Sequence, residues 1–318
     1  MKSFFIKLTI LFLSFFFLQA VVYNFICPPP ELSVVNDRLK NHYRFLYYGD
    51  SVIDTFSPYD NDVATISEMA SRKEPKILLG NVSHPGYHAT VYEEMTDYIA
   101  RSSNKPEAIV VEINLRSFSP EWDMKPEYQF PKEKFLYTIR PAFLGAFYNP
   151  LAVLRIINVA PISGKKSLNT PVYNGTVQVG TVADFEGDKF DTVTPENIKA
   201  KLIYHYMFDL SPDHRKLVSL KKMLAIAKKA EIKTYVYITP IDYQMGQKYI
   251  GKDFETQTAK NIAMICKIVR EENRPCLDLS HSVSHEGFYY ETYPNEHLNE
   301  IGRNLVAEKV SNILREGK

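Results

Sequence analysis

Residues 45–51, FLYYGDS, decide the fold class expected of this 318-residue chain. They end the segment 42–51, HYRFLYYGDS, whose apolar run predicts a short strand closed by a turn. A serine directly after a strand lies on a strand-to-helix turn, with its hydroxyl exposed at the carboxyl edge of the sheet. Ser51 is therefore a candidate nucleophile, although Asp-Ser is also ordinary turn or N-cap chemistry.

Further strands and helices alternate along the chain. Strands are predicted at 76–81 (KILLGN), 108–113 (AIVVEI), 233–239 (KTYVYIT) and 276–279, and helices between 87 and 102, at 217–230, at 254–272 and from 298 to 313. This alternation implies an α/β fold, a three-layer sandwich with a central parallel sheet wrapped on both faces. In such sheets, chemistry gathers at the carboxyl ends of the strands.

Residues 117–215 do not fit the alternation. They hold an aromatic stretch, 135–159, for which we expect helix, and a Gly/Thr/Val-rich segment, 173–182, which is typical of a hairpin. We interpret this region as an insertion that forms a lid or a partner surface. The expected domains are an N-terminal anchor with its flank, 1–30, and one α/β domain, 31–318, that carries the insertion.

The amino-terminal segment predicts a membrane anchor. Residues 8–27, LTILFLSFFFLQAVVYNFIC, carry no charge, and a helix of that length spans ~30 Å, the thickness of a bilayer core. Lys2 and Lys7 precede it, so the N-terminus is expected inside and the rest exported. Leu18 disfavours a signal-peptidase site, and Ile26 before Cys27 disfavours a lipoprotein. We therefore favour an uncleaved single-pass anchor in the cytoplasmic membrane, with the domain periplasmic or extracellular.

Composition excludes some classes of function. The 38 basic and 37 acidic residues are interspersed and form no basic stripe, so we expect no nucleic-acid partner. No CxxC motif or Cys/His cluster indicates a metal, and no cofactor is expected. Cys266 and Cys276 pair as a disulfide if the domain is exported; two buried free thiols are the alternative.

Three further residues fall where chemistry is expected. Gly86 follows the second strand, and its N–H can donate to an oxyanion, whereas alone it indicates a plain turn. Asn114 ends the third strand and can supply a second donor, with Glu112 on the same face as a buried partner or a surface residue. His297 precedes the last helix and can accept a serine proton; a structural capping histidine is the alternative.

The order serine, glycine, asparagine, histidine resembles the SGNH (GDSL-like) hydrolase superfamily. The matching pieces are FLYYGDS, HPGYH, VVEIN and NEHLNEIG, within residues 42–116 and 232–315. The resemblance implies a flavodoxin-like fold with Ser51 as nucleophile and His297 as base. It also implies an oxyanion hole formed by Gly86, Asn114 and the N–H of Ser51.

One position departs from the family. The residue three before the histidine is usually an aspartate that orients the ring, and here it is Pro294. Glu296, Asn295 or Glu291 can substitute, or a backbone carbonyl can leave a Ser-His dyad. The departure keeps a second hypothesis open, an inactive envelope protein that binds a glycan or a membrane partner.

An activated serine beside an oxyanion hole performs acyl transfer, to water in an esterase or to a hydroxyl in an O-acyltransferase. Anchored SGNH proteins of this plan resemble those that work beside membrane-bound O-acyltransferases in bacteria. The resemblance therefore implies acyl (acetyl) esters of cell-envelope polysaccharides or teichoic-type polymers as substrates, with such an acyltransferase as partner. A soluble secreted lipase would require cleavage of the anchor.

Overall fold

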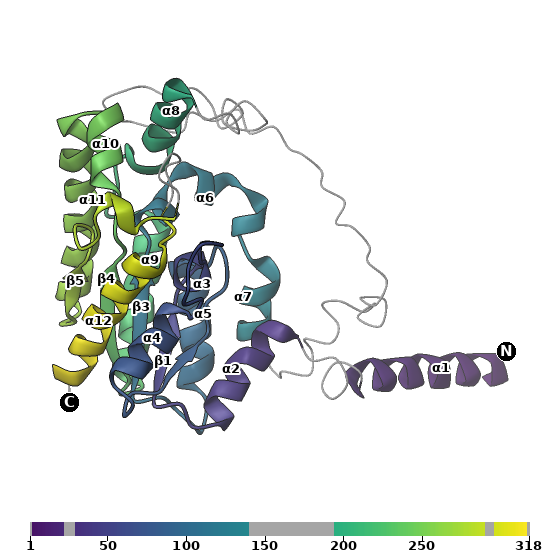
Figure 1. Ribbon diagram of the computed structural model, residues 1–318. Coiled ribbons are helices and arrows are strands. Elements are labelled where there is room, and N and C mark those ends of the chain that lie inside the picture. The colour runs from purple at the N-terminus through teal and green to yellow at the C-terminus, as the bar shows by residue number, and fades with distance from the viewer. Residues whose placement is uncertain (1, 22–28, 140–193, 290–295, 317–318) are drawn as a thin grey trace. The chain divides into compact units, whose positions relative to one another are not determined.

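The computed structural model describes residues 2–21, 29–139, 194–289 and 296–316 (Figure 1). The chain divides into two compact units. One combines Met1–Asp37 with Pro131–Lys166, and the other combines Arg38–Phe130 with Ser167–Lys318. The expected hairpin at 173–182 and most of the expected helix at 135–159 lie outside the described residues. The domain boundaries drawn from the sequence stay a prediction.

The larger unit is built on a five-stranded parallel sheet. Its strands are β1 (Phe45–Tyr48), β2 (Leu79–Asn81), β3 (Ala108–Ile113), β4 (Lys233–Ile238) and β5 (Cys276–Asp278), in the order β2-β1-β3-β4-β5. This order is the flavodoxin-like one. Every residue of β1 and β3 is buried, as expected for strands covered on both faces. The predicted fold class is confirmed.

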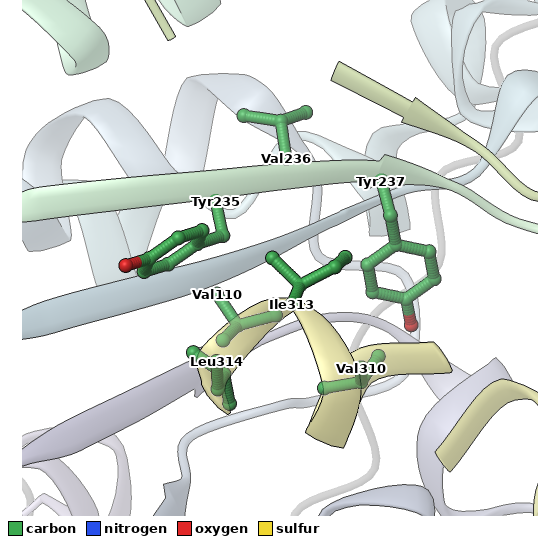
Figure 2. A pocket seen from close by; sticks show the side chains of 7 residues that line it. All are labelled: Val110, Tyr235, Val236, Tyr237, Val310, Ile313 and Leu314. Carbon is green, nitrogen blue, oxygen red and sulfur yellow. The ribbon is translucent and has the colours of Figure 1, made fainter. Parts of the chain in front are cut away.

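Helices cover both faces of the sheet. Helices α4 (Ile66–Lys73) and α12 (Glu300–Glu316) pack together on one face, whereas α5 (Ala89–Ala100), α9 (Arg215–Lys229) and α11 (Lys252–Glu271) form the other layer (Figure 1). Figure 2 shows Val310 and Leu314 of α12 against Val110 and Tyr237 of the sheet. The gap between them has no room for a water molecule, so it is packed core and no ligand site.

Shorter helices complete the larger unit. They are α3 (Ser51–Asp54), α6 (Pro120–Met124), α8 (Pro195–Tyr206) and α10 (Tyr243–Tyr249), with single 3₁₀ turns at Leu115–Phe118, Pro126–Tyr128 and His285–Gly287. Helix α4 was not predicted from the sequence, although Thr65 and Glu68 form a capping box at its start. That pair of residues is a signal visible in the sequence.

The smaller unit contains α1 (Lys2–Val21), most of α2 (Pro30–Lys40) and α7 (Pro131–Thr138). Helix α1 is long and apolar enough to cross a membrane. It begins six residues before the uncharged segment and includes Lys7, while residues 22–28 lie outside the described chain. Helices α2 and α7 are joined by an ion pair, with Lys132 Nζ 2.6 Å from Glu31 Oε1.

A disulfide links Cys266 of α11 to Cys276 of β5, with 5.4 Å between their Cα atoms. Of the two alternatives left open by the sequence, the structure has the disulfide. The bond ties the edge strand β5 to the helix that precedes it, so it constrains the outer margin of the sheet.

Candidate active site

Ser51 lies where the chain turns sharply from β1 into α3. Strand β1 ends at Tyr48, and Asp50 caps α3 by accepting a hydrogen bond from the Val52 N–H at 2.8 Å. Gly49 lies between them, and a Cβ at this position would displace the buried side chain of Ile53. The turn therefore presents Ser51, the first residue of α3, at the carboxyl edge of the sheet.

His297 meets this serine from the other end of the sequence. Its Nε2 lies 2.9 Å from Ser51 Oγ, although the two residues are 246 positions apart. Both side chains are half-buried, so a substrate can reach the hydroxyl while the pair keeps its orientation. With Nε2 unprotonated, the serine hydroxyl donates to it, which is the arrangement that general-base activation requires.

The residues after His297 hold it in place. Asn299 accepts the N–H groups at the start of α12, and its Nδ2 donates to the carbonyl of Glu286 at 2.6 Å. A Cβ at Gly302 would clash with the carbonyl oxygen of Gly287, so only glycine allows the helix this close to that loop. The Asn-x-x-Gly spacing thus fixes the segment that carries the imidazole.

Gly86 lies in a turn closed by a hydrogen bond from the Tyr87 N–H to the His84 carbonyl at 3.0 Å, with φ of 83°. The His84 N–H donates to the Gly49 carbonyl at 3.2 Å, which joins this turn to the one before Ser51. Within the described chain, the N–H groups of Ser51 and Gly86 have no hydrogen-bond acceptor. Both remain available to a developing oxyanion.

Asn114 is anchored from two sides. Its Nδ2 donates to Asp50 Oδ2 at 2.8 Å, and its Oδ1 accepts the Arg116 N–H at 3.0 Å. An amide nitrogen carries two hydrogens, so one is free for a second acceptor. The structure therefore joins Asn114 to the residue next to Ser51 and leaves it one donor.

A buried pair of carboxyl groups supports the turn. The backbone N–H of Asp50 donates to Glu112 Oε1 at 3.4 Å, and the Tyr237 hydroxyl donates to Glu112 Oε2 at 3.0 Å. Burial and the negative charge of Asp50 raise the pKa of Glu112 well above its ordinary value. Glu112 is buried, so of the two roles expected it has that of a buried partner.

Three residues were expected as substitutes for the missing aspartate, and Glu296 is the one that the structure describes. Asn295 and Glu291 lie outside the described residues, as does Pro294. The Glu296 carboxylate is 2% exposed, and Arg116 Nη1 contacts both oxygens at 2.9 Å. Burial alone would raise its pKa, but Arg116, followed by His297, lowers the pKa to about 2. A permanent negative charge therefore lies close to the imidazole.

Sequence reasoning missed two charged residues at this edge. Arg116, two residues after Asn114, had no motif to mark it, and only the fold brings it to Glu296. Asp54 lies one helical turn after Ser51, and burial and the charge of Asp50 raise its pKa, while His297 opposes that rise. The spacing of Ser51 and Asp54 at i and i+3 was the available signal.

The other histidines near His297 in sequence have partners elsewhere. His285 Nδ1 lies 2.6 Å from Asp242 Oδ2, and Asp242 also caps α10. His281 stacks on Tyr243 with 3.8 Å between ring centroids. Ser51 therefore meets His297 and neither of these two.

No family model and no curated protein matches the sequence. Among solved structures, the chain is similar to an aryl esterase of M. smegmatis, at 8% identity over 86% of this chain and 98% of that one, with a TM-score of 0.43. It is similar to Est24, a carbohydrate acetylesterase from Sinorhizobium meliloti, at 7% identity, 86% and 99% coverage and a TM-score of 0.42. It is also similar to an Axe2 mutant, an acetyl-xylooligosaccharide esterase from Geobacillus, at 12% identity over 86% of this chain and 92% of that one, with a TM-score of 0.39.

Proposed function

We propose that this protein is a serine-dependent acyl-ester enzyme, an esterase or O-acyltransferase, that forms an acyl-enzyme on Ser51. The observation that carries the proposal is the 2.9 Å contact between Ser51 Oγ and His297 Nε2. A serine hydroxyl is a weak nucleophile by itself, and a neutral imidazole at this distance can take its proton as the bond to the acyl carbon forms.

The reaction runs in two steps. The Ser51 oxygen attacks the ester carbonyl, its proton moves to His297 Nε2, and the N–H groups of Ser51 and Gly86 with the Asn114 amide receive the oxyanion. The imidazolium returns the proton to the leaving alcohol, and the acyl group stays on Ser51. Water or a sugar hydroxyl, deprotonated by His297, then removes the acyl group.

In this proposal, Glu296 supplies the negative charge that the missing aspartate would otherwise place near the imidazole. Its carboxylate is ionised because Arg116 pairs with it, and it lowers the free energy of the imidazolium that forms after the first proton transfer. Arg116 Nη1 contacts both oxygens of Glu296, and we assign this carboxylate the stabilisation of charge.

We further propose that the enzyme works on acyl, in particular acetyl, esters of cell-envelope polymers. Helix α1 supports an anchor in the cytoplasmic membrane, with Lys2 and Lys7 favouring an inside N-terminus. The disulfide between Cys266 and Cys276 supports an oxidising compartment outside the cytoplasm. A membrane-bound O-acyltransferase is the proposed partner, and it would donate or receive the acyl group.

Active-site labelling tests the proposal. We expect a fluorophosphonate probe to modify the full-length protein in detergent on Ser51, and on no other residue. Ser51→Ala abolishes the labelling, and His297→Ala slows it by about a hundredfold or more, because the hydroxyl loses its base. Asp242→Asn, at the second carboxylate–histidine pair, is the matched control and keeps the wild-type rate.

The second candidate is a non-catalytic envelope protein that kept this fold to bind a glycan or a membrane partner. The observation that favours it is the absence of an aspartate at position 294. It predicts no labelling of Ser51 and no ester cleavage, with glycan binding unchanged in Ser51→Ala.

A further inference from the structure

The segment after α3 carries large apolar side chains that point into solvent. We call residues 55–64 the aromatic loop. Phe56 is 47% exposed, Tyr59 is 92% exposed and Val63 is 54% exposed. Single exposed apolar residues need no explanation, but three within eight positions, next to a candidate nucleophile, form a patch that marks an interaction site.

The aromatic loop is held rigidly. Arg303 of α12 is fully buried, and it donates to the backbone carbonyls of Thr55, Asp62 and Ala64 and to Asp60 Oδ2 at 2.8 Å. Arg303 also donates to the Leu298 carbonyl at 3.2 Å, so this buried guanidinium ties the loop to the segment before α12 and resists rearrangement of the loop. The apolar side chains are therefore exposed on a fixed support, so a ligand binds without first ordering the loop.

The loop also contacts both halves of the candidate active site. At one end, the Thr55 N–H donates to the Ser51 carbonyl at 2.9 Å. At the other, the N–H groups of Asn61 and Asp62 donate to Glu300 Oε2 at 2.8 and 3.2 Å, and Glu300 lies three residues after His297. The patch is thus continuous with the segments that carry the nucleophile and its base.

The charges of the loop indicate which polymer it fits. Residues 51–64 contain Asp54, Asp60 and Asp62 and no lysine or arginine. The arginines that reach the loop are paired, Arg72 with Asp62 at 2.6 Å and Arg303 with Asp60 at 2.8 Å. A polyanion such as a teichoic-type phosphate chain, or an anionic lipid surface, needs unpaired cations, and residues 51–64, all of which the structure describes, supply none.

We infer that Phe56 and Tyr59 form a platform on which the sugar rings of a neutral polysaccharide stack while one of its esters reaches Ser51. The inference rests on the proposed function, because it names the substrate class of that same site. Aromatic rings offer an apolar face to the C–H face of a sugar, and the Tyr59 hydroxyl and the exposed Asn61 amide offer hydrogen bonds to its hydroxyls.

The test is binding by isothermal titration calorimetry, with full-length Ser51→Ala protein in detergent so that no ester is consumed. The probes are acetylated xylo-oligosaccharide, which is neutral, and polyglycerol phosphate, which is anionic. We expect the neutral probe to bind, and Tyr59→Ala or Phe56→Ala in the same background to weaken its binding about three- to tenfold each. The matched control is Leu78→Ala. Leu78 is 53% exposed and lies just before β2, at the amino ends of the strands, so its removal leaves binding unchanged.

Three results would overturn the platform: preference for polyglycerol phosphate, no binding of the neutral probe, or equal binding by the Tyr59→Ala and Leu78→Ala proteins. Thermal unfolding of each variant confirms that the fold is retained, as expected for side chains this exposed. Fluorophosphonate labelling of the wild type separates the two proposals. Failure to label Ser51 counts against the enzyme, whereas insensitivity of glycan binding to Tyr59 counts against the platform alone.

Discussion

Glu296→Gln isolates the electrostatic contribution of the buried carboxylate beside the imidazole. The substitution keeps the shape of the side chain and removes its charge. We expect kcat/KM on 4-nitrophenyl acetate to fall about ten- to a hundredfold, because the imidazolium formed during attack loses its neighbouring anion. The fall is smaller than that for loss of a full triad acid, because the positive charge of Arg116 already offsets part of the Glu296 charge.

The contribution of ionised Glu296 to the free energy of unfolding follows from the pKa of this carboxyl. Its ordinary value is 4.5 and its value in the folded protein is about 2, so ionisation stabilises the fold by about 3 kcal/mol above the ordinary pKa. A depressed carboxyl pKa gives stability that is present above pH ~4.5 and is lost as the pH falls toward ~2. Glu296→Gln should therefore remove this part of the loss of stability in acid.

The assay is urea unfolding of wild type and variant at a series of pH values, together with the steady-state kinetics. Glu107→Gln is the matched control, because Glu107 also receives two guanidinium bonds, from Arg44 at 2.6 Å, but at the exposed surface. We expect the control to keep its activity and to lose less than about 1 kcal/mol. Equal kcat/KM for wild type and Glu296→Gln, or parallel pH profiles of stability, would refute the assigned role.

Three further substitutions test the supporting structure. Glu112→Gln should keep the wild-type activity. It should also lose less stability than the wild type as the pH rises above the ordinary glutamate pKa of 4.5, because the raised pKa of Glu112 means that the folded protein keeps a proton that the unfolded chain releases; urea unfolding at a series of pH values measures this. Gly302→Ala should lower stability by about 1–3 kcal/mol and slow labelling of Ser51, because the new methyl group meets the Gly287 carbonyl. Cys266→Ser should lower the free energy of unfolding by about 3 kcal/mol in urea, from loss of a cross-link across 10 residues.

Each of these has a contrary outcome. A Glu112→Gln protein whose stability declines with pH as steeply as that of the wild type would mean that Glu112 is ionised when folded. Normal labelling in Gly302→Ala would mean that the loop before α12 adapts without moving His297. Unchanged unfolding of Cys266→Ser relative to wild type would mean that the thiols are not joined in solution.

Much of the fold followed from local pattern. The apolar run at 108–113 matches β3 at both ends, and the run at 233–239 differs from β4 by one residue. Long strands covered on both faces are mostly apolar, so their boundaries are visible in the sequence. The second strand was predicted to begin three residues too early, because the apolar Ile77 and Leu78 precede the paired segment that starts at Leu79.

The candidate site was predictable only in part. Ser51, Gly86, Asn114 and His297 each follow a strand or precede the last helix, and it was their joint order, with the family resemblance, that selected them. Arg116 was not selected, because its contact with Glu296 joins positions 180 apart that share no sequence motif. Buried ion pairs depend on which side chains the fold excludes from water, and local sequence does not encode this.

Intact-mass and peptide mass spectrometry of the full-length protein, quenched in acid shortly after mixing with 4-nitrophenyl acetate, tests the central claim most directly. We predict a single acetyl group on the peptide that contains Ser51, absent in Ser51→Ala and formed far more slowly in His297→Ala. An unmodified Ser51 in the wild type during turnover, or an acetyl group that persists on other residues when Ser51 is replaced, would contradict it.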